Sequence, residues 1–426
     1  MTVTAITNVH GRRVWDSRGR PTVEVEVTLA GGASGRAIAP AGASTGSGEA
    51  VDLRDRGAAF GGFDVTGAVA AVNGPIAAAL AGADAADQAG ADRRLIEADG
   101  TENRSRLGGN ALVATSMAVA HAAAAAAGVP LWRFLAGGRD AVLPLPEIQI
   151  LGGGAHAGRR VDIQDYMVIA TGAADYAQAL DWTAEVYRAA GAILSEEGRL
   201  QGVADEGGFW PAFDTNEEGL ALLVRAIERA GLIPGDQVAI SLDVAASEFG
   251  RAGRYRLARE DRDMDSDGLA ALLVDWIERY PIVAIEDPLG EDDAEGLARF
   301  TAAVGERVEI VGDDFLVTNA KRVTAAAGQG ACNAVLIKPN QAGTLSEARA
   351  AVEAARAAGF GAIVSARSGE TEDVTIVHLA VGWGVPQLKV GSFARSERMA
   401  KWNEGIRIAE EVGGALPPSE AFVWNR

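Results

Sequence analysis

Six ionisable residues stand at or near the ends of short apolar runs in the second half of the chain. The runs are VAISLD, IVAIED, VEIVGDD, NAVLIK, AIVSAR and PQLKVGS, and the residues are Asp243, Glu286, Asp313, Lys338, Arg367 and Lys389. A single charge at such a place is typical of a solvated strand end. Six charges in register predict one ionic site, because the C-terminal ends of barrel strands meet at one mouth.

Three of these residues are carboxylates, Asp243, Glu286 and Asp313, with no histidine or cysteine beside them in the sequence. Such an all-oxygen set suits a hard cation, and Mg²⁺ is the ion predicted. Because Mg²⁺ takes some of its ligands from the substrate, we expect an anionic oxygen acid to bind there. Pairing of the carboxylates with nearby lysine and arginine is the alternative, but it leaves excess negative charge once Glu206 is added.

Lys338 and Glu206 are candidates for a base and an acid. The charged form of Lys338 would be disfavoured by a metal and by Lys389, which predicts a base for a proton alpha to a carboxylate. Glu206 lies in VADEGGFWP, where the apolar Phe209 and Trp210 would raise its pKa and let it protonate a leaving hydroxyl. Taken alone, the DEGG motif is more typical of a turn.

The elements that must carry these residues differ between the two halves of the chain. From Val3 to Ala39 the residues alternate, most clearly in TVEVEV, which predicts a three-stranded antiparallel meander. Helix-like stretches follow from Val65 to Leu135. Beyond a segment rich in glycine and proline, strand-like runs alternate with helices, which predicts a closed α/β barrel. We therefore expect an α+β capping domain over residues 1–136 and a catalytic barrel over residues 143–426.

Composition narrows the class of partner. The 426 residues carry a net charge of −19, which disfavours binding to nucleic acid or anionic lipid and favours a small anionic ligand held by local cations. The single cysteine, Cys332, is predicted to be a buried thiol, which fits a cytoplasmic protein. The apolar window from Ala111 to Val129 is interrupted by polar residues and is predicted to be a core helix, not a membrane span.

A loop of small residues, Ala41 to Gly48, could close over a ligand as a lid or serve as a flexible connection. At this point the motifs taken together resemble the enolase family. They are DSRGRPTVEVEV, GASTG, GGAHA, ADEGGF, LDVAASEF, IEDPLGEDD, GDDFLVTN, LIKPNQAGTLSE, RSGETED and ARSERMAKWN. They stand in enolase order and cover essentially the whole chain. The resemblance implies a small α+β domain, an enolase-type modified TIM barrel, two Mg²⁺ ions per active site and a homodimer.

The resemblance also implies roles for individual residues. Asp243, Glu286 and Asp313 would hold the first Mg²⁺, and Ser44 on the lid would help to hold the second. Lys338 would be the base and Glu206 the acid. Lys389 would contact the substrate carboxylate, Arg367 and Ser368 would bind the phosphate, and His156 would be the loop histidine that closes on the substrate. A histidine in a glycine-rich loop is otherwise usually a surface residue.

Three departures from the family surround the expected substrate. Ala366 replaces a histidine, and Gln164-Asp165 replaces Gln-Glu, which shortens a carboxylate that works beside the acid. Arg159 and Arg160 form a more basic pair than enolases carry, and could bind an additional anionic group or lie on a solvated surface.

These changes predict a lyase that removes water from a substituted 2-phosphoglycerate. An example is the carboxyphosphonoenolpyruvate synthase reaction of phosphonate antibiotic biosynthesis. The alternatives are an ordinary enolase and a non-catalytic homologue that only binds.

Overall fold

The N-terminal part of the computed structural model, which describes residues 2–425, begins with an antiparallel sheet. Its strands β1 (Ile6–Trp15), β2 (Pro21–Leu29) and β3 (Ser34–Ile38) pair in sequence order, which confirms the predicted meander. Helices α1 to α5 follow. Their bounds are Thr66–Ala71, Ala77–Leu80, Gln88–Asp99, Gly109–Ala126 and Leu131–Ala136.

Helix α4 packs against β2 and β3 and forms the centre of this part of the core. It is long and apolar enough to cross a membrane by length and composition, but 83% of it is buried inside the protein. Its run of alanines therefore serves close packing against the sheet, as expected for a core helix.

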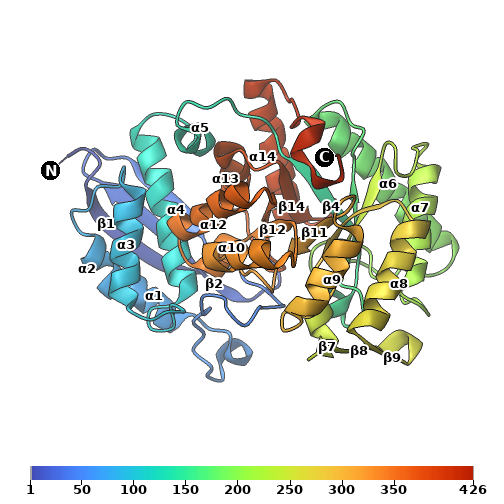
Figure 1. Cartoon of the computed structure of the whole chain (residues 1–426). Coiled ribbons are helices and arrows are strands. Elements are labelled where there is room, and N and C mark those ends of the chain that lie inside the picture. The colour runs from blue at the N-terminus through green and yellow to red at the C-terminus, as the bar shows by residue number, and fades with distance from the viewer. Residues whose placement is uncertain (1, 426) are drawn as a thin grey trace.

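Eight strands close into the predicted barrel, which lies beside the N-terminal part in Figure 1. Around the barrel the order is β10, β11, β12, β13, β14, β4, β5, β6. The bounds are Ile282–Glu286, Glu309–Gly312, Ala334–Ile337, Gly361–Ser365, Gln387–Gly391, Leu145–Gly152, Asp165–Ile169 and Ala239–Asp243. All six runs singled out in the sequence form strands of this barrel.

Strand β5 runs antiparallel to both of its neighbours, β4 and β6. The segment 153–164 that joins β4 to β5 holds one short 3-10 helix (Gly154–Ala157) and no α-helix, so the chain is not carried back to the other end of the barrel as a parallel pair needs. Reversal places the first residue of β5 at the mouth, where Asp165 pairs in register with Asp243 at the end of β6. An antiparallel strand thus still delivers a carboxylate to the cavity.

Helices surround the barrel in the order α6 to α14. Their bounds are Tyr176–Glu196, Glu217–Arg229, Ser266–Arg279, Ala294–Val304, Ala320–Gln329, Pro339–Ala342, Leu345–Ala358, Thr375–Trp383 and Ser396–Val412. A small sheet of β7 (Gly250–Arg251), β8 (Arg254–Leu257) and β9 (Arg262–Asp265) follows β6. Cys332 is a buried free thiol, as predicted.

Candidate active site

A small cavity at the barrel mouth brings together most of the residues that the sequence singled out. The predicted residues that line it are Ser44, His156, Gln164, Asp165, Glu206, Asp243, Lys338, Arg367, Ser368 and Lys389. Ala366 also lines it. The lid therefore reaches the barrel mouth, and a bridge between Ala41 and Gly369 fixes its start.

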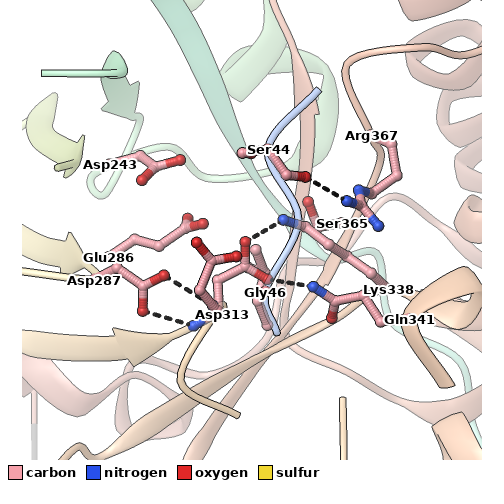
Figure 2. A network of polar contacts seen from close by, with 12 residues as sticks. Ser44, Gly46, Asp243, Glu286, Asp287, Asp313, Lys338, Gln341, Ser365 and Arg367 are labelled. Atoms are coloured by element: carbon pink, nitrogen blue, oxygen red, sulfur yellow. Dashed lines mark hydrogen bonds and ion pairs between the residues drawn. The ribbon is translucent and has the colours of Figure 1, made fainter. Parts of the chain in front are cut away.

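The metal-ligand candidates are paired with the two lysines that line this cavity. Lys389 Nζ donates to Glu286 Oε2 at 2.6 Å and to Asp243 Oδ2 at 3.0 Å. Lys338 Nζ donates to Asp313, and Figure 2 shows these side chains converging from neighbouring strand ends. Each of the three carboxylates holds a lysine in this state.

Burial and like charge dominate the electrostatics of this group. Burial raises the pKa of Glu286 well above its ordinary value, and Asp243 raises it further. Burial also opposes the charged form of Lys338, but Asp313 and Glu286 outweigh it, so the pKa of Lys338 is raised. The protein groups alone therefore favour a charged Lys338, because its nearest partner is an ionised carboxylate, and the neutral Lys338 expected beside a bound metal stays a prediction.

The donor set fits a divalent cation. Asp243, Glu286 and Asp313 offer only oxygen, and Glu286 Oε1 is buried without a hydrogen-bond partner. Gln164 Oε1 is likewise buried and unpartnered. A buried carboxylate with a raised pKa and an open oxygen, as Glu286 is, is a group that a hard cation stabilises. When bound, a divalent cation would neutralise these carboxylates, favour a neutral Lys338 and stabilise negative charge developing on a substrate carboxylate.

Asp287, which the sequence analysis missed, positions two of these strand ends. It follows Glu286 directly, in a left-handed backbone conformation with φ of 41°. Its carboxylate accepts the backbone N–H of Asp313 at 3.0 Å and of Asp314 at 2.8 Å. Aspartate tolerates this conformation better than most residues. The sequence feature that could have identified Asp287 is its place in the IEDP motif, one residue after the candidate ligand Glu286.

A second group of charges lies next to Lys389, whose Nζ is 3.8 Å from Asp165 Oδ2. His156 Nδ1 lies 3.1 Å from Asp165 Oδ1, and ligand atoms of His156, Asp165 and Glu206 lie within 4.8 Å of one another. Burial of the ring opposes protonation, but Asp165 and Glu206 outweigh it and raise the pKa of His156 to about 9. His156 is therefore a buried cation, not the surface residue that its loop alone would suggest.

Glu206 reaches the cavity on a turn that needs glycine. Gly207 has a φ of 96°, and a Cβ there would lie 2.5 Å from the carbonyl oxygen of Ala394. The aromatic residues that follow do not form the apolar wall expected beside Glu206. Phe209 stacks on Tyr187 with ring centroids 4.4 Å apart, and neither Phe209 nor Trp210 lines the cavity.

The arginine pair lies outside the cavity. Arg159 donates to the carbonyl oxygen of Glu248 at 3.0 Å and to Glu248 Oε2 at 2.9 Å, and its side chain is 62% exposed. Arg160 lies over the ring of Trp210 at 4.9 Å. The structure thus does not bring Arg159 to the substrate. The alternative given for this pair, a solvated surface, agrees with the geometry.

Arg367 and Ser368 face the lid. Ser368 Oγ accepts the N–H of Ala43 at 2.7 Å and an N–H of Arg18 at 3.2 Å. Arg367 pairs with Glu49, the residue directly after the lid, which the sequence analysis missed although it stands five positions after Ser44. Arg18 was quoted only as part of the DSRGRP motif.

Two family models together cover nearly the whole chain. The model described as "Enolase, N-terminal domain" matches residues 6–135, and "Enolase, C-terminal TIM barrel domain" matches residues 140–417. A relative named Enolase from Tropheryma whipplei (strain Twist) is 48% identical over 410 residues, which is 96% of this chain and 95% of that protein.

Proposed function

Because this chain belongs to the enolase family of carbon–oxygen lyases, we propose that it removes water from 2-phosphoglycerate to give phosphoenolpyruvate. The observation that carries the proposal is that Lys338, Glu206 and Lys389 line one cavity, and that both lysines pair with the all-oxygen set of Asp243, Glu286 and Asp313. The cation is proposed to be Mg²⁺, held by Asp243, Glu286 and Asp313, with Ser44 helping to hold a second ion.

In this mechanism Lys389 binds the substrate carboxylate, and Arg367 and Ser368 bind the phosphate. A cation held by Asp243, Glu286 and Asp313 would stabilise the negative charge on that carboxylate. Lys338 Nζ takes the proton from the carbon alpha to the carboxylate, so that a C–H bond breaks and its electrons move toward the carboxylate. Glu206 then gives a proton to the departing hydroxyl as the C–O bond breaks. A carbon–carbon double bond forms and one water leaves.

The residues beside the acid have supporting roles. Asp165 accepts from His156 and from Gln149 Nε2, and Gln164 Nε2 donates to Asp243 Oδ2 at 3.0 Å. These contacts hold the cavity wall in one arrangement before substrate arrives. His156 and Asp165 therefore position Glu206, and His156 adds positive charge near the substrate.

The ordinary reaction is favoured over the substituted substrate predicted from the sequence. That prediction relied on space at Ala366 and Asp165 and on charge from Arg159, and Arg159 pairs with Glu248 outside the cavity. The space at Ala366 and Asp165 leaves the substituted substrate as the second candidate. The relative at 48% identity is itself named Enolase, which also favours the ordinary reaction.

The test is to incubate the purified protein and Mg²⁺ separately with 2-phosphoglycerate and its carboxyphosphono analogue. We expect enolpyruvate product from 2-phosphoglycerate. Turnover of the analogue alone would establish the second candidate. Lys338→Met should abolish turnover, whereas Lys321→Met, which changes an exposed lysine at the start of α10, should not. A non-catalytic homologue would show no turnover with either compound.

A homodimer and a cytoplasmic location belong to the same proposal, because both are inferred from the family. The proposed division into residues 1–136 and 143–426 is supported by the limits of the two family models.

A further inference from the structure

The guanidinium of Arg367 donates hydrogen bonds to the lid and to Glu49, the residue that follows it. Nη1 donates to Glu49 Oε2 at 2.9 Å and to Asn340 Oδ1 at 3.2 Å. Nη2 donates to the carbonyl oxygen of Ser44 at 2.8 Å and to Glu49 Oε1 at 3.3 Å. These two nitrogens carry four hydrogens, so each hydrogen has an acceptor, and three of the four acceptor contacts are to Ser44 on the lid and to Glu49, which follows the lid directly.

The contact is buried and close. The side chains of Arg367 and Glu49 are 3% and 8% exposed. The lid backbone lies against the guanidinium, since a Cβ on Gly42 would lie 1.8 Å from Nη2. A buried arginine without an anionic partner is strongly destabilising. Glu49 supplies that partner here.

Glu49 also connects the lid to the metal-ligand side of the cavity. Its Oε1 accepts the N–H of Gly46 at 3.0 Å and the Nε2 of Gln341 at 3.3 Å. Gln341 in turn donates to Asp313 Oδ1 at 2.9 Å, as Figure 2 shows. A substitution at Glu49 therefore changes hydrogen bonds to the lid and to Gln341 as well as those to Arg367.

We propose that Glu49 is a resident anion that holds Arg367 until a phosphate group displaces it. The inference rests on the proposed function, which makes Arg367 a phosphate ligand. A phosphate oxygen and the Glu49 carboxylate cannot accept the same Nη hydrogens. A phosphate group carries more charge than a carboxylate and has three acceptor oxygens. It therefore competes for the planar guanidinium of Arg367, whereas a weaker monoanion does not. Glu49 thus sets the affinity and the selectivity of the anion site.

The test compares inorganic phosphate binding, by calorimetry in the presence of Mg²⁺, for the native protein, Glu49→Gln and Glu291→Gln. Glu291 is the matched control. Its Oε2 accepts Ser47 N at 3.0 Å and Ser47 Oγ at 3.2 Å, so it tethers the same lid without contacting Arg367. We expect phosphate to bind Glu49→Gln about tenfold more tightly than the native protein, and Glu291→Gln within about twofold.

Glu49→Asp is a second variant that keeps the charge but shortens its reach, and it should also bind phosphate more tightly. Equal or weaker binding in both Glu49 variants would overturn the proposal, as would an equal gain in Glu291→Gln, which would point to lid loosening alone. Absence of phosphate binding in every protein would also overturn it. Because binding is measured without turnover, a native protein inactive on 2-phosphoglycerate would refute the proposed function and leave the Glu49 result standing.

Discussion

The buried charge on His156 predicts that closure of its loop depends on pH. The pKa of His156 rises from the ordinary 6.5 to about 9, against the effect of burial, because Asp165 and Glu206 lie beside it. This difference corresponds to about 3 kcal/mol in favour of the closed loop. Because the pKa in the closed loop is the higher one, the stabilisation is fully present below pH 6.5 and is lost as pH rises through about 9.

Hydrogen exchange over residues 153–163 measures this closure. In metal-free buffer, and after correction for the intrinsic pH dependence of exchange, protection should fall by about a hundredfold between pH 6.5 and pH 9.5. His156→Asn should abolish that dependence, because the titrating ring is gone. His10→Asn, which changes an exposed histidine on β1, is the control and should leave the profile unchanged.

Protection that stays constant from pH 6.5 to pH 9.5 in the native protein would refute this reasoning. An equal effect of His10→Asn would also refute it, since the dependence would then come from the surface and not from the Asp165 pair.

Three further outcomes are expected. Glu206→Gln should stop the release of water while the substrate alpha hydrogen still exchanges with D₂O, because Lys338 still removes the proton. Mass spectrometry of the recovered substrate measures this deuterium exchange. Asp287→Gly keeps the left-handed backbone but loses the acceptor for two N–H groups, so its Mg²⁺ affinity, measured by calorimetry, should fall about 10–100-fold. The decrease in Mg²⁺ affinity should be smaller in Asp287→Asn. Mg²⁺ at a hundred times its Kd should raise the free energy of unfolding by about 2.7 kcal/mol, and Glu286→Gln should remove most of this gain in thermal unfolding.

The sequence predicted the barrel well because its core strands are short apolar runs with a charge at the end. Strands β4 and β5 were not among those runs, and β5 is reversed because the segment 153–164 between them holds no crossover α-helix. No local pattern encodes that reversal, because it depends on how the sheet closes. The proximity of Asp165 and Asp243 at the mouth consequently depends on tertiary structure and not on local sequence.

The site could be predicted to the level of which residues meet, but not which of them pair. Strand ends converge for topological reasons, so Lys338 and Asp313 were expected near one another. Partner choice depends on side-chain reach and burial, which is why the raised pKa of Lys338 was missed. For the same reason the sequence left two interpretations of Arg159 open, because its charge fitted an anion but its loop directs it to Glu248.

The pairings suggest how cation and substrate depend on each other. In the described state Lys338 and Lys389 neutralise the carboxylates that are proposed to hold Mg²⁺, and Glu49 neutralises the arginine that is proposed to hold phosphate. A divalent cation alone would release two lysine charges into a buried cavity, and a phosphorylated acid alone would add negative charge to it. Each therefore removes the electrostatic cost of the other, and by linkage each must raise the affinity of the other by the same factor.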